Sequence, residues 1–251
     1  MQRRYRLRFQ RAFGWRSAHE TNSGPEIRLR DVALAVGVPI PSTILVLIVC
    51  APILAIAKIK LPAAVAATAV LYLSWIVSYR WVASNHSWEN LSTKFAPINL
   101  KPLLGGAALA VGLLPLTAAL AAVLEMFDSH PGEIPPSPLL PHAISDLPAA
   151  FALFIVVGPL AEELLFRGLL LDWLKQKMNV WAASLLLSLL FALLHDNGFI
   201  YGHVGWVLFI QRFLVGLGTS ALAIRYRTLL PSFAMHATLN GIACISSLMS
   251  A

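Results

Sequence analysis

Seven long stretches of this chain carry almost no charge, and they decide its fold class. A helix that crosses a bilayer needs about 20 apolar residues, within a range of about 17 to 25. Of the 251 residues, 58% are hydrophobic and only 12% are charged, whereas about a quarter of an ordinary soluble domain is charged. The seven candidate spans are residues 32–57, 61–79, 102–124, 147–161, 178–194, 202–224 and 228–251. We therefore predict an all-α, polytopic transmembrane helical bundle of about seven spans.

The positive charge of the chain is concentrated before the first span. Residues 1–31 hold eight arginines and three acidic residues, and the whole chain has a net charge of +7. The positive-inside rule places such an arm in the cytoplasm, where it could touch anionic headgroups. No nucleic-acid-reading fold accompanies the arm, so we predict a lipid bilayer and no nucleic acid as its partner. The compact chain suggests the plasma membrane of a bacterium.

Alternating the spans from a cytoplasmic N-terminus assigns each loop to one side. The basic residues that fall inside are Arg80, Lys94, Lys101, Lys175, Lys177, Arg225 and Arg227. The acidic residues that fall outside, in a loop without Lys or Arg, are Glu125, Asp128, Glu133 and Asp146. The exception is the Lys58-Ile59-Lys60 turn, which falls outside. Prolines at 131–141 indicate an external loop. We divide the chain into a basic arm (1–31), N-terminal transmembrane helices with this loop (32–146), and a helical core (147–251) that carries the polar motifs.

Two adjacent glutamates, Glu162 and Glu163, follow the fourth apolar stretch directly. A carboxylate in hydrocarbon is costly, so such acids mark pathways or active sites unless they are paired. Arg167 follows Glu163 by four residues and therefore shares its helix face. We predict that Glu163 pairs with Arg167, and that Glu162 is left free for a substrate or a water molecule. Gly158-Pro159, just before, can break or kink the helix.

A tight turn near Met178 sets the depth of the next polar residue. We expect one helix to run to about Gln176 and the next to start near Val180. Glu162 lies 16 residues before Met178 and His195 lies 17 residues after it. Antiparallel helices rise equally per residue, so the two side chains should sit level and within reach of each other.

A third helix carries His236 and Asn240, which are four residues apart and share a face. Each polar group also has a simpler interpretation. Glu163 and Arg167 could be an ion pair near a helix end, and His195 could end a helix before the turn signal Asp196-Asn197-Gly198. His236 and Asn240 could be interhelical hydrogen-bonding groups. Burying so many polar groups without a use is costly, so we favour an intramembrane polar cavity that they share.

The order of three motifs resembles one known family. Glu162-Glu163-x-x-x-Arg167, then Phe191-x-x-x-His195, then His236-x-x-x-Asn240 is similar to the CPBP family of CAAX-protease and bacteriocin-processing membrane proteins. This family includes the type II CAAX endopeptidase of eukaryotes. The resemblance covers about residues 147–245, and residues 1–146 carry no matching motif.

The resemblance implies an intramembrane endopeptidase that hydrolyses a peptide bond in a membrane protein or peptide. It implies that Glu162 activates water with help from His195, and that His236 and Asn240 face the oxyanion. Glu163 and Arg167 would support Glu162, and we interpret Phe191 as a packing residue. We expect no cofactor and no metal. If a metal such as zinc is used, its ligands would be Glu162, His195 and His236, with one position open.

Two other functions remain open from the sequence. Intramembrane Glu, His and Arg also build proton-coupled transporters, although no inverted repeat is visible. The chain could also be a catalytically idle family member that acts as an immunity or scaffold protein. Arg212, in the sixth span, could pair with Glu163, touch a substrate carboxylate, or extend to the membrane surface. The sequence predicts no oligomeric state.

Overall fold

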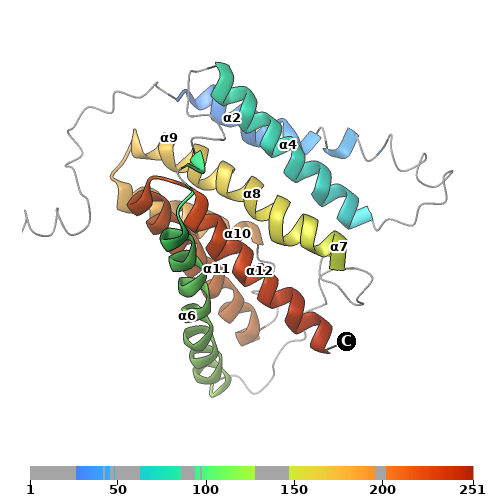
Figure 1. The fold of residues 1–251 in the computed structure, drawn as a ribbon, viewed down its shortest axis with the longest axis vertical. Helices are drawn as coiled ribbons and strands as arrows, with labels where there is room; N and C mark the ends of the chain where they lie inside the picture. The colour runs from blue at the N-terminus through green and yellow to red at the C-terminus, as the bar shows by residue number, and fades with distance from the viewer. Residues whose placement is uncertain are drawn as a thin grey trace, which may run out of the picture.

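Helices make up the regular structure of the part of the chain that can be described (Figure 1). The computed structural model describes residues 27–41, 43–45, 48, 63–85, 94–96, 98–127, 147–195 and 202–250. The basic arm up to residue 26, the turn at 58–60, the proline-rich loop at 131–141 and the turn at 196–198 lie outside these residues. The all-α fold class predicted from the apolar stretches is confirmed.

Most helices begin and end close to the predicted spans. The separate helices are α2 (Leu29–Gly37), α4 (Ala63–Asn85), α6 (Leu100–Glu125), α10 (Val180–His195), α11 (Gly202–Tyr226) and α12 (Leu230–Ser250). A further helix of 29 residues runs from Leu147 to Lys175. It consists of α7 (Leu147–Ala150), η2 (Phe151–Val157), α8 (Gly158–Glu163), η3 (Leu164–Leu170) and α9 (Leu171–Lys175). The predicted turn near Met178 is confirmed, because α9 ends at Lys175 and α10 starts at Val180.

Pro159 does not break the long helix, contrary to one outcome that the sequence allowed. Proline has no N–H to continue the α-helical ladder. The segment before it, η2, is π-helical, and the Gly158 N–H bonds to the carbonyl of Leu153, five residues back. Such wide turns occur inside α-helices, frequently at functional sites. The helix therefore continues through the proline and carries the glutamates in its middle.

Fewer helices qualify as spans than the seven predicted. Among the described residues, four helices are long and apolar enough to cross a membrane: Val65–Ser84, Leu100–Glu125, Leu147–Lys175 and Val204–Tyr226. The apolar helix Val180–His195 is shorter. Helix α12, with 21 residues, is long enough to cross a membrane. Its polar side chains lower its mean hydropathy, so it does not count among the four. Residues 49–57 of the first predicted span lie outside the described residues, and the count of about seven spans stays a prediction.

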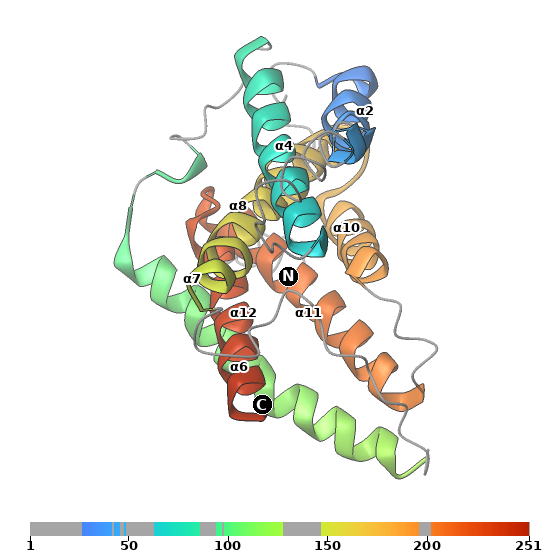
Figure 2. The same ribbon diagram turned by 90° about the vertical axis from the view of Figure 1, so that its right-hand side faces the viewer.

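The long helix Leu147–Lys175 occupies the middle of the bundle. It lies between α4 on one side and α12 on the other (Figure 1), and both neighbours contact α8. Helices α6, α11 and α12 pack together, and α10 packs against α11, as the turned view also shows (Figure 2). Three helices, α4, α10 and α12, thereby pack around the central one.

Helix α10 shows how the bundle distributes its side chains. Leu185, Leu189 and Leu193 are 51%, 41% and 46% exposed. Ser184 and Ser188 are buried, and each donates its hydroxyl to the carbonyl four residues back. Apolar side chains outside and small polar ones between helices are typical of membrane bundles. Together with the long apolar helices, this identifies an integral membrane protein.

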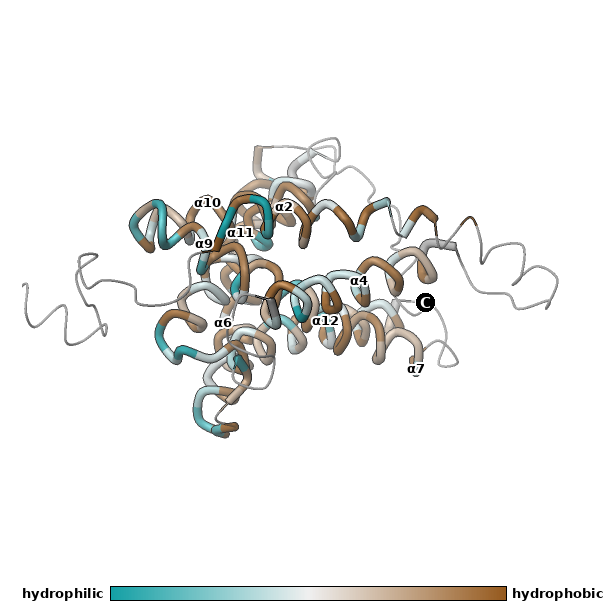
Figure 3. The backbone as a smooth tube through the Cα atoms, turned by 90° about the horizontal axis from the view of Figure 1, so that it is seen from above, coloured by the Kyte–Doolittle hydropathy of each residue, from teal (hydrophilic) through white to brown (hydrophobic). Residues whose placement is uncertain are grey.

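Polar segments gather at the end of the bundle where α9, α10 and α11 meet (Figure 3). The Lys94 Nζ lies 2.7 Å from Asp172 Oδ2, and Lys175 Nζ lies 2.6 Å from Asp172 Oδ1. The Lys94 carbonyl accepts hydrogen bonds from the Leu229 N–H and the Thr228 hydroxyl. These contacts place Lys94, Lys175 and the α11–α12 turn at one end, as the predicted alternation of spans requires.

Candidate active site

The central helix places three charged side chains inside the protein. Glu162 is 4% exposed, Glu163 is 0% exposed and Arg167 is 2% exposed. Buried charges need partners, because removing a charge from water is expensive unless other charges or hydrogen bonds replace the water. The contacts of each group therefore indicate how the site is built.

Glu163 and Arg167 form the predicted pair. The Arg167 Nη1 lies 3.3 Å from Glu163 Oε1, and Nη2 donates to the Gly216 carbonyl at 3.1 Å. The guanidinium carbon also lies 4.8 Å from the centre of the Phe191 ring. An ion pair, a carbonyl and an aromatic face together replace the water that the guanidinium lost on burial. Arg167 therefore connects the central helix to α10 and α11.

Gly216 allows this arrangement on α11. A Cβ at this position would lie 2.8 Å from the Ser188 Cα, a distance that real Cβ atoms essentially never show. The glycine therefore lets α10 and α11 approach each other closely. The same residue offers its carbonyl to Arg167. The backbone at Gly216 thus serves both helix packing and the charged cluster.

The two oxygens of Glu162 face different partners. The Tyr72 hydroxyl donates to Oε1 at 2.7 Å. Oε2 lies 3.3 Å from His195 Nε2 and 3.7 Å from His236 Nε2. The prediction that Glu162 and His195 sit level is confirmed by this distance. Glu162 is not free in the sense the sequence suggested, because protein groups already surround both of its oxygens.

His195 is held by the helix that it ends. Its Nδ1 lies 2.8 Å from the Phe191 carbonyl, and its ring lies 4.2 Å from the Phe191 ring, centre to centre. A carbonyl only accepts hydrogen bonds, so Nδ1 carries the hydrogen. In the neutral ring, Nε2 then accepts, and it faces Oε2 of Glu162, which also accepts. A hydrogen bond between these two atoms therefore requires a proton on one of them.

His236 lies between the two glutamates. Its Nδ1 is 3.2 Å from Glu163 Oε1, while its Nε2 faces Glu162. The ring packs edge-on against Phe191, with the centres 5.6 Å apart. Phe191 also contacts Phe166 and His195. One aromatic ring thus supports both imidazoles and the guanidinium of Arg167.

Asn240 contacts the backbone of the central helix. Its Nδ2 donates to the Phe154 carbonyl at 2.7 Å. In a regular helix, that carbonyl would accept from residue 158 or 159. The Gly158 N–H bonds to Leu153 instead, and Pro159 has no N–H. Asn240 therefore satisfies a carbonyl that the proline leaves without a helical partner.

The contact between Tyr72 and Glu162 was not predicted from the sequence. Tyr72 comes from α4, whose only charged residue is Arg80 and which carries none of the three motifs. A signal was available, because a tyrosine hydroxyl buried among apolar groups usually finds a hydrogen-bond partner. That signal gives no information on which partner it finds.

Arg212 lies near His195. Its charge acts on His195, from α11. Glu163 has Arg167 and His236 within reach. The three roles that the sequence left open for Arg212 stay predictions.

The predicted metal ligands are Glu162, His195 and His236. Among the residues that the structure describes, no group of three His, Cys, Asp or Glu side chains is arranged to hold one. Glu162 contacts both imidazoles directly, and Nδ1 of His236 is engaged by Glu163. Zinc as a cofactor stays a prediction from the sequence, and no step below uses a metal.

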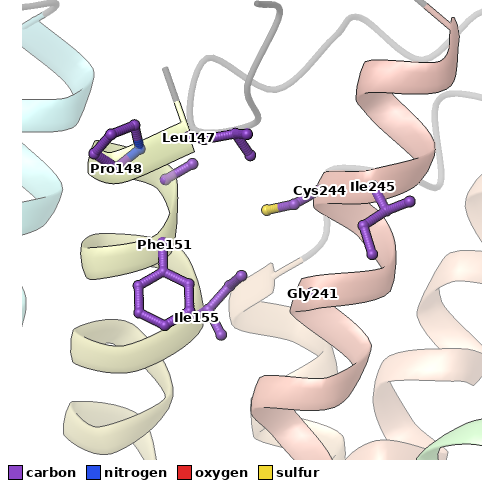
Figure 4. A pocket seen from close by; sticks show the side chains of 8 residues that line it. Leu147, Pro148, Phe151, Ile155, Gly241, Cys244 and Ile245 are labelled. Atoms are coloured by element: carbon purple, nitrogen blue, oxygen red, sulfur yellow. The ribbon is translucent and has the colours of Figure 1, made fainter. Parts of the chain in front are cut away.

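An apolar pocket of about 410 Å³ lies between the start of the central helix and α12 (Figure 4). Phe151 and Ile155 of the central helix line one side, and Gly241 and Cys244 of α12 line the other. These residues neighbour the contact between Phe154 and Asn240 along both helices. The cavity offers space for apolar groups beside the polar cluster.

Comparison with known proteins places these residues in context. A family model described as "Type II CAAX prenyl endopeptidase Rce1-like" matches residues 144–242. An uncharacterized 24.3 kDa protein of Escherichia coli is 30% identical over 174 residues, which cover 67% of this chain and 73% of the relative. No solved structure matches the chain. The matched region contains both glutamates, both histidines and Asn240, and it excludes Tyr72.

Proposed function

Because the chain belongs to the Rce1-like family of type II CAAX prenyl endopeptidases, which are intramembrane proteases, we propose that Glu162 is the base that activates water for peptide-bond hydrolysis. The observation that supports this most directly is the position of Oε2, which faces the Nε2 atoms of both His195 and His236. A carboxylate and two imidazoles around one point can bind a water molecule and move its protons.

The reaction would proceed in two steps. A water molecule that binds beside Glu162 and His195 gives a proton to this pair as its oxygen attacks the scissile carbonyl. The proton then passes to the leaving amine, and the C–N bond breaks. Because Oε2 of Glu162 and Nε2 of His195 face each other at 3.3 Å, the pair can accept a proton from water and release it again.

Stabilising the oxyanion falls to His236 and Asn240 in this proposal. Nε2 of His236 can donate when it carries a proton, while Nδ1 stays on Glu163. Asn240 gives one amide hydrogen to Phe154 and has a second one to offer. Donors fixed in advance at a developing oxyanion contribute several kcal/mol in a site that excludes water. Glu163 and Arg167 keep His236 in place.

The substrate we propose is a membrane protein or peptide cut close to an apolar segment. The catalytic groups lie inside a membrane bundle, and an apolar pocket is lined by Gly241, the residue after Asn240. Such a site suits a peptide that arrives through the bilayer with an apolar part. We propose that the protein resides in a bacterial plasma membrane with its N-terminus in the cytoplasm.

The test uses purified protein in detergent and a library of quenched fluorescent peptides with apolar ends. Wild-type protein should cut a member of the library without any ion gradient, which a transporter would not do. Glu162→Gln should abolish cleavage, and the matched control Glu125→Gln, at the exposed end of α6, should retain it. Full activity of Glu162→Gln, or no cleavage by the wild type, would reject the proposal.

A further inference from the structure

The polar cluster contains one side chain from outside the region that the family model matches. Tyr72 lies on α4, and the match covers residues 144–242. Its hydroxyl donates to Glu162 Oε1 at 2.7 Å, within the usual range for a hydroxyl and a carboxylate. Helix α4 also packs against α8. The N-terminal part of the chain therefore reaches the carboxylate that we propose as the base.

The contact makes the two oxygens of Glu162 unequal. Oε1 receives a hydrogen bond from Tyr72, while Oε2 faces both imidazoles. A carboxylate that is held at one oxygen cannot exchange its two oxygens by rotation without breaking that bond. Tyr72 thus determines which oxygen points to the position where water would be activated.

Gly158 provides the space that this contact needs. A Cβ at Gly158 would lie 2.8 Å from Tyr72 Cε2 and 3.0 Å from the Leu153 carbonyl oxygen. Any larger residue would displace the tyrosine ring, which packs on its own helix against Trp75, with ring centres 5.9 Å apart. Gly158 lies one turn before Glu162 on the same helix. The Tyr72 ring therefore packs over Gly158 while its hydroxyl reaches Glu162.

We propose that Tyr72 is a positioning residue for the hydrolysis. It holds the Glu162 carboxylate so that Oε2 is directed at His195 and His236. This inference rests on the proposed function of Glu162 as the base. Loss of the hydroxyl leaves the glutamate in place but lets its carboxylate rotate, so fewer enzyme molecules have the productive geometry. The loss therefore lowers kcat and leaves substrate binding largely unchanged.

The chain contains a matched control two helical turns away. Tyr79, also on α4, packs over Gly168 of the central helix, where an added Cβ would lie 3.0 Å from Tyr79 Cε2. Both tyrosines therefore cover a glycine of the same partner helix. Only Tyr72 has Glu162 as a hydrogen-bond partner. Paired substitutions separate the effect on Glu162 from the general effect of disturbing α4.

The experiment measures kcat, KM and the thermal midpoint of Tyr72→Phe and Tyr79→Phe in detergent. Since the lost hydrogen bond joins a hydroxyl to a charged group, we expect kcat of Tyr72→Phe to fall about tenfold or more. Its KM should stay within about twofold of the wild type, because no substrate contact is removed. Tyr79→Phe should keep kcat within about twofold, whatever its effect on stability.

Glycine substitutions give a second measurement should Tyr72→Phe fail to fold. Gly158→Ala should reproduce the loss of kcat by displacing the ring, and Gly168→Ala should not. Unchanged kcat in Tyr72→Phe, or equal losses in the two members of either pair, would overturn the inference. Its failure is distinguishable from failure of the proposed function, because the latter appears as cleavage by Glu162→Gln.

Discussion

The side-chain amide of Asn240 donates to the backbone carbonyl of Phe154, across two helices, at 2.7 Å. The contact exists because Pro159 cannot donate to that carbonyl and the Gly158 N–H is turned to Leu153. The family resemblance assigns Asn240 an oxyanion role. Asn240 therefore also satisfies a backbone carbonyl in the helix that carries the proposed base. Stability and catalysis can be separated experimentally at this position.

Asn240→Ala should lower the free energy of unfolding by about 1–3 kcal/mol, because it leaves the Phe154 carbonyl buried without a donor. In Pro159→Ala, the restored N–H can serve the helix, so the double variant should be more stable than the two single effects predict when added. The measurement is a denaturant titration in mixed micelles. Strict additivity of the two effects would contradict the explanation.

Arg167→Met should be strongly destabilising, by about 3–5 kcal/mol, because it leaves Glu163 charged and buried without its cation. Adding Glu163→Gln removes that charge and keeps an acceptor for His236. The double variant should therefore be more stable than Arg167→Met alone. The same titration checks this, and a double variant less stable than the single one would show that the pair does not act as a unit.

Gly216→Ala should destabilise the bundle by about 1–3 kcal/mol, as overpacking of a tight contact does. The added methyl group would meet Ser188 at 2.8 Å and push α10 away from α11. Gly112→Ala, in the middle of α6, is the control because no atom lies within 4 Å of the added Cβ. Thermal midpoints in detergent report both. The interpretation fails if the two alanines have equal effects.

Chelators should leave cleavage unchanged, because the mechanism proposed here uses no metal. The assay treats purified protein with a zinc chelator and measures peptide cleavage before and after dialysis. Loss of activity on chelation, with recovery on adding zinc, would instead make Glu162, His195 and His236 metal ligands.

Single cysteines at Lys177 and Arg225 should react from the same side of the membrane, and one at Glu125 from the opposite side. Lys177 follows the end of α9, Arg225 lies in the last turn of α11, and Glu125 ends α6. The native cysteines Cys50 and Cys244 are first replaced by alanine. A membrane-impermeant maleimide, applied to intact cells and to inverted vesicles, gives the side. With a cytoplasmic N-terminus, Lys177 and Arg225 react only in inverted vesicles.

Much of this architecture follows from local rules. Apolar stretches predicted where most helices lie, because crossing a membrane requires long apolar segments whose backbone bonds are internal. The pair Glu163–Arg167 followed from a spacing of four residues on one helix. The equal depth of Glu162 and His195 was predicted by counting residues along two helices that are joined by a tight turn and rise equally per residue.

Other features depended on how distant helices pack. The amino-acid sequence by itself determined the helices, their apolar faces and the glutamate, histidine and asparagine motifs. Only the tertiary structure decided that Tyr72 holds one oxygen of Glu162 and that Asn240 serves Phe154. These contacts depend on the rotation and spacing of α4 and α12 against the central helix, which are set by close packing over Gly158 and by the π-helical turn before Pro159. Periodicity along one helix contains no information about either, because it describes faces and not which neighbour covers them.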